Sequence, residues 1–400
     1  MIPVVSTLAS VWLASGFISH ANGLEGEKRP DQGGTLSAQP VLLWAVHLPG
    51  AVPNVAAPTE PGAPVVSGDR IFVGYSGVNA LLVLDREDGR VVTQLATRAP
   101  VSCAPIVQGD SLIVADSAGY TAGWTKHGTE WTQTWEHFSG APIVSTPTVR
   151  EGTVFVTNVD ELVFALDSVS GQLKWRYEHR LDAARSTELE LFGAPAAGVD
   201  GEFVYSGFSD GFLAAIDRAT GSERWTALVG EGTYPDIIAP AIPLEDGGVV
   251  VAGYSKPLER LDPKTRTPSW RIEVGSAAGP AIAGETMYHP GSDGKLRRVD
   301  TRTGTIAWTW DSGTTGPLLT PELTPQGVLV ASSDTTVYMI DPDTGAVRWT
   351  LDPGPLLTGF ASAPAVAGDN IYALSNGGVL YALRGRANSA RPPSLPWVSR

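Results

Sequence analysis

The segments 166–175 (LDSVSGQLKW) and 216–225 (IDRATGSERW) decide the fold, because they repeat one pattern. An apolar residue precedes an Asp, a Gly follows four residues after that Asp, and a Trp follows eight residues after it. Regular self-similarity of this kind is typical of repeat architectures. The pattern returns at 299–308 (VDTRTGTIAW) and 340–349 (IDPDTGAVRW), with Arg266 replacing the Gly at 261–270 (LDPKTRTPSW) and Thr93 replacing the Trp at 84–93 (LDREDGRVVT).

A second landmark, a small residue followed by Pro, comes before each β-rich run of the chain. The spacings between these prolines are 41, 42, 48, 45, 40, 41 and 43 residues, and they lie at positions 64, 105, 147, 195, 240, 280, 321 and 364. A period near 43 with four short strands per unit is typical of propeller blades. We therefore predict an all-β fold, an eight-bladed β-propeller of four-stranded repeats over residues 40–385.

The last repeat unit lacks its outer strand. It stops at 379–385 (VLYALRG), and the next residues are too rich in Pro to form a strand. The segment 40–50 (PVLLWAVHLPG), which carries Trp44, supplies a candidate from the other end of the chain. Pairing it with the last blade would close the ring and remove two exposed strand edges. The second unit is also irregular, since Thr125 replaces the Asp and either Trp131 or Trp135 could serve as the outer-strand Trp.

Each repeated position of the pattern has an expected structural role. The carboxylate should accept hydrogen bonds from backbone N–H groups of its own turn, and the Gly should supply a positive φ. The Trp should wedge between neighbouring blades and donate its N–H to a carbonyl there. We assign these roles to Asp85, Asp167, Asp217, Asp262, Asp300 and Asp341, to Gly89, Gly171, Gly221, Gly304 and Gly345, and to Trp44, Trp175, Trp225, Trp270, Trp308 and Trp349.

Composition narrows the possible functions. The formal charge of −14 disfavours nucleic acid as a partner, because the protein would repel phosphate. The single cysteine, Cys103, excludes an internal disulfide and a cysteine-based metal site. We identify residues 1–23 as a probable signal peptide, 24–39 as a linker and 386–400 as a flexible tail. No later stretch approaches the roughly 18 apolar residues of a membrane span, so we expect an exported, monomeric ring in the periplasm or cell envelope.

The repeats resemble the PQQ-like β-propeller family, whose units are similar in layout to WD40 blades. That family includes quinoprotein dehydrogenases, which bind pyrroloquinoline quinone (PQQ) and calcium, and non-catalytic BamB-type subunits of the outer-membrane protein assembly machinery. The size, the single ring and the export signal look more like the BamB type, although no lipidation cysteine follows the apolar N-terminal run. The motif specifies architecture rather than chemistry, so the resemblance alone fixes no activity.

Two classes of function follow. The first is a non-catalytic, BamB-like interaction scaffold with envelope-protein partners and no cofactor, catalytic residue or metal. The alternative is a PQQ-dependent oxidoreductase with calcium; it would need a ligand set that we cannot assign, and no vicinal cysteine pair is present. A carbohydrate-binding or lyase propeller is a third, less favoured class.

One long insertion is the candidate partner-binding segment. Residues 178–193 (EHRLDAARSTELELFG) mix charged and apolar side chains between two blades, where propellers present rim loops. We predict contacts with an envelope protein through Arg180, Leu181, Arg185, Leu189, Leu191 and Phe192. The irregular stretch 229–240 (VGEGTYPDIIAP) is a second candidate.

Overall fold

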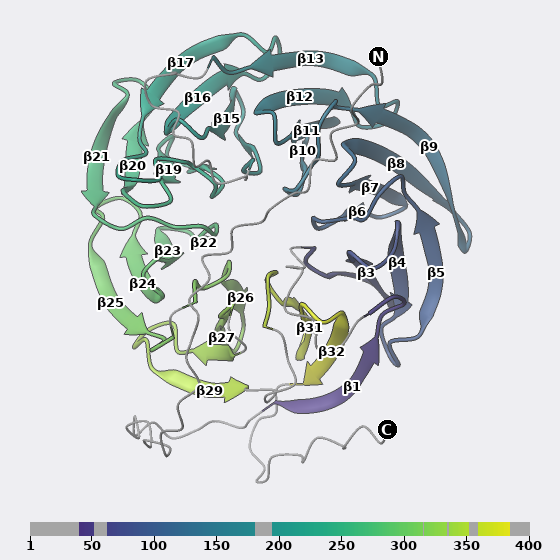
Figure 1. The fold of residues 1–400 in the computed structure, drawn as a ribbon. Helices are drawn as coiled ribbons and strands as arrows, with labels where there is room; N and C mark the ends of the chain where they lie inside the picture. The colour runs from purple at the N-terminus through teal and green to yellow at the C-terminus, as the bar shows by residue number, and fades with distance from the viewer. Residues whose placement is uncertain are drawn as a thin grey trace, which may run out of the picture. The chain divides into compact units, whose positions relative to one another are not determined.

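A computed structural model describes residues 40–51, 62–180, 194–314, 316–333, 336–351 and 359–384. These residues all belong to the second of two units, Thr35–Arg400. They form 32 strands in eight four-stranded antiparallel sheets, which are arranged as blades around a ring (Figure 1). The predicted signal peptide (1–23), linker (24–39) and tail (386–400) lie outside the described residues.

The first four blades follow one another along the chain, each with its strands in sequence order from the inner to the outer edge. Blade 1 has β2 (Val65–Ser67), β3 (Arg70–Gly74), β4 (Ala80–Asp85) and β5 (Val91–Ala96). Blade 2 has β6 (Ile106–Gln108), β7 (Ser111–Ala115), β8 (Tyr120–His127) and β9 (Glu130–Phe138). Blade 3 has β10 (Thr148–Arg150), β11 (Thr153–Thr157), β12 (Leu162–Asp167) and β13 (Leu173–Glu178). Blade 4 has β14 (Gly198–Val199), β15 (Phe203–Gly207), β16 (Phe212–Asp217) and β17 (Glu223–Leu228).

The last four blades complete the circuit. Blade 5 has β18 (Ile242–Pro243), β19 (Val249–Ala252), β20 (Leu258–Asp262) and β21 (Thr267–Ile272). Blade 6 has β22 (Ala281–Ala283), β23 (Thr286–Pro290), β24 (Lys295–Asp300) and β25 (Ile306–Asp311). Blade 7 has β26 (Glu322–Thr324), β27 (Gly327–Ala331), β28 (Val337–Ile340) and β29 (Val347–Leu351). Blade 8 has β30 (Ala365–Ala367), β31 (Asn370–Leu374), β32 (Val379–Arg384) and, from the start of the chain, β1 (Val41–His47).

The N-terminal strand closes the ring. β1 pairs antiparallel with β32, with Val41 opposite Arg384 and His47 opposite Val379, so the purple strand β1 and the yellow strand β32 lie side by side in Figure 1. The outer strand of blade 8 thus comes from the opposite end of the chain, and the last blade has no exposed third strand. The predicted eight-bladed ring, closed by the strand that carries Trp44, is confirmed.

The middle strands of most blades are largely apolar, because both faces of each blade are covered by neighbouring blades. One core cluster joins Phe155 and Ala165 of blade 3 to Val204, Ala214 and Ile216 of blade 4. Such double burial explains why these strands read as continuous apolar runs rather than as an alternation of apolar and polar residues. The cores of the propeller therefore lie between blades.

The outer-strand Trp of one blade lies against the turn Gly of the next. Trp175 Nε1 of blade 3 donates to the Arg218 carbonyl of blade 4 at 2.9 Å, and a Cβ placed on Gly221 would lie 2.7 Å from the indole ring. Gly221 also has a φ of +72°, so it satisfies both the turn and the close approach. Equivalent N–H···O=C bonds join Trp135 to Ser168, Trp270 to Thr301 and Trp308 to Pro342, and the ring of Trp44 covers Gly89.

The other two Trp residues of the repeat pattern are buried in seams that lack the turn Gly. Trp225 packs in the core between blades 4 and 5, where the turn position is Arg266, held at a φ of +61°. Trp349 packs against Ile371 and Leu383 of blade 8, whose outer strand is not preceded by such a turn.

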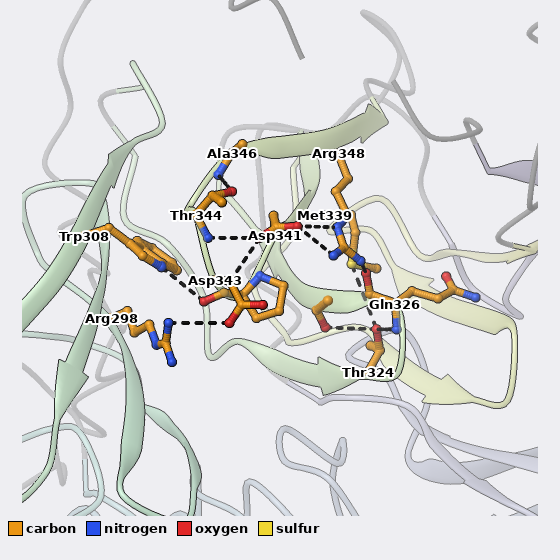
Figure 2. A network of polar contacts seen from close by, with 12 residues as sticks. Arg298, Trp308, Thr324, Gln326, Met339, Asp341, Asp343, Thr344, Ala346 and Arg348 are labelled. Carbon is orange, nitrogen blue, oxygen red and sulfur yellow. Dashed lines mark hydrogen bonds and ion pairs between the residues drawn. The ribbon is translucent and has the colours of Figure 1, made fainter. Parts of the chain in front are cut away.

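Each pattern Asp organises the turn on which the neighbouring Trp lies. Asp217 Oδ1 accepts the backbone N–H groups of Ala219 and Thr220, while Arg224 donates to Oδ2. The hydrogen bonds from Arg224 and from Thr220 lower the pKa of Asp217 to about 2. Figure 2 shows the same arrangement in blade 7, where Thr344 and Arg348 converge on Asp341 beside Trp308. The Asp85, Asp167, Asp262 and Asp300 carboxylates accept turn N–H groups in the same way.

The seam between blades 1 and 2 is built differently. Blade 1 has Thr93 where the Trp would stand, and blade 2 replaces the Asp–Gly turn with the longer hairpin of β8 and β9. This hairpin fills the seam itself, since Trp124 is buried there and Trp131 meets Phe72 edge-on at 5.8 Å. The docking Trp and its receiving turn are therefore lost together, and Trp135 serves the next seam.

Removing a docked indole should destabilise the ring. We expect Trp175→Ala to lower the free energy of unfolding by about 3–5 kcal/mol, the usual cost of deleting a large buried aromatic side chain. Trp175→Phe should cost less, because it keeps most of the apolar contact and loses only the hydrogen bond to the Arg218 carbonyl and a part of the ring. Urea unfolding of both variants measures the difference, and equal, negligible losses would show that the seam does not depend on this Trp.

Candidate interaction face

One edge of the ring carries all the long connections. In every blade the turn between the second and third strands lies at the same edge as the connection that leads to the next blade, because consecutive strands are antiparallel. We call this edge, over blades 3 to 5, the connection face. The longest connection there runs from Glu178 at the end of β13 to Gly198 at the start of β14. Of the predicted partner-binding residues, Arg180 is described and exposed; Leu181, Arg185, Leu189, Leu191 and Phe192 lie outside the described residues.

A buried contact between a His and an Asp side chain forms the root of this connection. His179 Nε2 lies 2.9 Å from Asp210 Oδ2, and the two side chains are 6% and 0% exposed. The imidazole also stacks on Phe208, with ring centroids 4.1 Å apart. The chain is thus fixed one residue before Arg180, which stands at the surface.

A strained glutamate lies beside this root. Glu161 has a φ of +61° at a turn position where four other blades have Gly119, Gly211, Gly294 or Gly378. A left-handed conformation is costly for an L-residue with a side chain. Its Oε1 accepts the Ser209 N–H at 2.6 Å, which ties blade 3 to blade 4, and burial raises the pKa of this carboxyl. Strain held in place by a buried polar contact is common at functional sites.

The second connection, 229–240, rests on the turns of two blades. The N–H groups of Val229 and Gly230 both donate to the Gly211 carbonyl in blade 4, and Glu231 N–H donates to the Lys256 carbonyl in blade 5. Tyr234 meets Tyr254 edge-on, with ring centroids 6.1 Å apart. The connection therefore presents a partly exposed aromatic pair between charged residues.

A charged network holds this connection to the outer strand of blade 5. Arg271 donates through both Nη atoms to the Glu231 carboxylate, at 3.1 and 2.7 Å, and through Nε to Glu273 at 2.6 Å. Lys256 Nζ also donates to Glu273, at 3.1 Å. A third carboxylate, that of Glu259, is 3% exposed and lies 3.9 Å from Arg271 Nη1, too far for a hydrogen bond. Burial raises the pKa of Glu259 to about 7.

The described residues contain no cluster of acidic, His or Cys side chains suited to a metal ion. No group of three or more His, Cys, Asp or Glu side chains within them is placed to hold a metal ion. The six pattern aspartates are each engaged in the turn of a different blade, so they do not converge as a calcium ligand set. Cys103 is buried, which raises the pKa of its thiol to about 12 and keeps it protonated. The described residues form strands and turns and contain no helix that could cross a membrane.

With the ring and its connection face described, comparison with known proteins places the chain. The family model described as outer membrane protein assembly factor BamB, built on PQQ-like repeats, matches residues 30–130, 127–236 and 235–397. The chain belongs to this BamB family. A BamB protein of Burkholderia pseudomallei is 25% identical over 338 residues, which cover 81% of this chain and 84% of that protein. The crystal structure of BamB from Moraxella catarrhalis has the same fold, with a TM-score of 0.69 and 16% identity over 86% of this chain and 100% of that one.

A quinohemoprotein alcohol dehydrogenase of Pseudomonas putida is 30% identical over 142 residues. This match covers 32% of the BamB-family chain and 19% of the dehydrogenase, whereas the Burkholderia match spans most of both chains. The dehydrogenase match is therefore a match between stretches of repeat.

Sequence reasoning missed the groups that fix the connection face. Glu161 could have been found, because it stands where neighbouring units have Gly. Glu259 could also have been found, because 258–262 (LERLD) places a charge in a strand that is apolar in 162–167 (LVFALD) and 212–217 (FLAAID). The pairing of Glu231 with Arg271, 40 residues apart, has no such signal.

Glu259 should make stability depend on pH. Its folded pKa, about 7, lies above its ordinary value of 4.5, so its contribution to stability is complete below pH 4.5 and is lost as the pH rises through 7. Between pH 5 and pH 8 we expect the wild type to lose about 1–3 kcal/mol relative to Glu259→Gln. Urea unfolding at the two pH values measures this difference. Parallel losses in both proteins would contradict a buried, titrating Glu259.

Proposed function

We propose that this protein is a non-catalytic scaffold of the cell envelope that holds a partner during outer-membrane protein assembly. The observation that carries the proposal is the connection face, where 178–193, a long sequence of charged and apolar residues, begins at a fixed root formed by His179 and Asp210. Membership of the BamB family, and the printed role of those relatives as outer membrane protein assembly factors, support the same function.

The rigid ring suits such a role. Each blade is fixed to the next through a buried seam, so the connections at its edge keep a defined arrangement and need little ordering when a partner binds. Glu231 and Tyr234 lie in the connection that follows the insertion. Tyr234 packs edge-on against Tyr254 of the β19–β20 turn, and Glu231 pairs with Arg271 of β21. The formal charge of −14 favours a partner surface of basic or mixed charge.

The proposed scaffold is exported, acts in the periplasm or at the envelope, and works as a monomeric ring without a cofactor. PQQ-dependent oxidation is the alternative. It would need residues that bind calcium and the quinone, and the described residues contain no group of three or more His, Cys, Asp or Glu side chains placed to hold a metal ion.

Shortening the insertion tests the scaffold. We expect replacement of residues 181–191 by a short Gly-Ser linker to weaken binding to the purified outer-membrane assembly complex of the same organism at least about tenfold, because it removes most of the predicted contact residues. Biolayer interferometry measures the affinity. Circular dichroism should show an intact fold, because the segment lies outside the strand pattern. The matched control is Glu285→Ala with Arg302→Ala, an exposed ion pair at the opposite edge of the ring, which should bind like the wild type.

Two results would contradict the proposal. One is wild-type protein that does not bind the complex, or a shortened variant that binds equally well. The other is stoichiometric uptake of PQQ in the presence of calcium, followed by substrate-dependent reduction of a redox dye, which would assign the protein to the oxidoreductases.

A further inference from the structure

We propose that Glu259 competes with Glu231 for Arg271, so that connection 229–240 is clamped to blade 5 when Glu259 is protonated and is released when Glu259 is ionised. The inference concerns the ring alone and stands whether or not the connection contacts a partner.

The contacts define the clamped state. Arg271, on the outer strand β21, uses both terminal nitrogens for Glu231 and its Nε for Glu273. The Glu231 backbone N–H donates to the Lys256 carbonyl at 2.9 Å, so side chain and backbone hold the same residue of the connection. A bidentate Arg–carboxylate pair fixes orientation as well as distance. Arg271 therefore acts as the fastening point of the connection.

Glu259 is placed to take this fastening point over. It lies on β20, directly opposite Arg271 in the strand register, and its Oε2 is 3.9 Å from Nη1, the same nitrogen that donates to Glu231. A neutral carboxyl at this distance attracts the guanidinium weakly. A buried carboxylate attracts it strongly, because its charge is poorly screened by water. A small rotation of Arg271 toward Glu259 would break its bond to Glu231, whose side chain can turn to solvent.

Burial favours protonation of Glu259 in the clamped state and raises its pKa to about 7. The positive charge of Arg271 opposes this effect, and the negative charges of Glu231 and Glu273 add to it. Lys256 is engaged with Glu273. When Glu231 leaves and Arg271 turns inward, Glu259 loses a repulsive neighbour and gains a hydrogen-bonded cation. Its pKa must then fall, so by linkage a rise in pH through about 7 favours release.

Hydrogen exchange at Glu231 reports the clamp directly, because its amide proton is held by the Lys256 carbonyl. After correction for the intrinsic effect of pH on exchange, we expect the protection factor of residues 229–233 to fall about tenfold between pH 5.5 and pH 8. Glu259→Gln should keep high protection at both pH values. Glu231→Gln should give low protection at both, while amides of the β23–β24 hairpin in blade 6 serve as the internal reference.

A second measurement separates competition from a merely structural role. Competition requires the effect to be reciprocal, so Glu231→Gln should lower the pKa of Glu259, followed by the chemical shift of its side-chain carboxyl carbon. Protection at 229–233 that does not change with pH in the wild type, or that changes equally in Glu259→Gln, would overturn the proposal. So would a Glu259 pKa that is unaffected by Glu231→Gln.

Discussion

Docking of an outer-strand Trp on the turn of the next blade is the contact on which the propeller depends. The indole needs a surface without a side chain, so the turn carries Gly at positive φ. A carboxylate then accepts the N–H groups of this turn. In the seam between blades 3 and 4, the buried Trp175 ring donates a hydrogen bond to a backbone carbonyl and lies against Gly221, while Asp217 caps the turn. Repetition of this small unit gives a ring whose stability is distributed over its seams.

The exceptions show that the seam, rather than the motif, is maintained. Where Thr93 replaces the Trp, the neighbouring turn is absent as well, and the longer β8–β9 hairpin brings Trp124 and Trp131 into the gap. In the closing seam, Trp44 arrives from the other end of the chain and covers Gly89. The packing between neighbouring blades is thus maintained although the residues that provide it vary. The edge of the ring opposite to the Asp–Gly turns carries connections of different length, and the connection face is part of that edge.

The repeat made most of the fold predictable, because Asp, Gly and Trp at fixed spacing state both the turn and its contact. The position of β1 followed from the missing outer strand of the last unit. The choice between Trp131 and Trp135 did not follow, because Thr125 breaks the motif; the strand register, with Gly123 opposite Trp135, decides it. The connection face was predicted only as irregular segments. Asp210, Glu161 and Arg271, which fix this face, contact residues that are distant in sequence and lie in another strand or blade, and no local pattern encodes such contacts.

We propose that the connection face over blades 3 to 5 holds an envelope partner. Photocrosslinking in living cells tests this role most directly, with a photoreactive amino acid placed at Arg180 or Tyr234 and, for comparison, at Arg302 or Asp369 on the opposite edge. We expect crosslinks to a component of the outer-membrane assembly complex from Arg180 and Tyr234 and none from the other two positions. Crosslinks only from Arg302 and Asp369, or none from any position in cells that contain the complex, would contradict it.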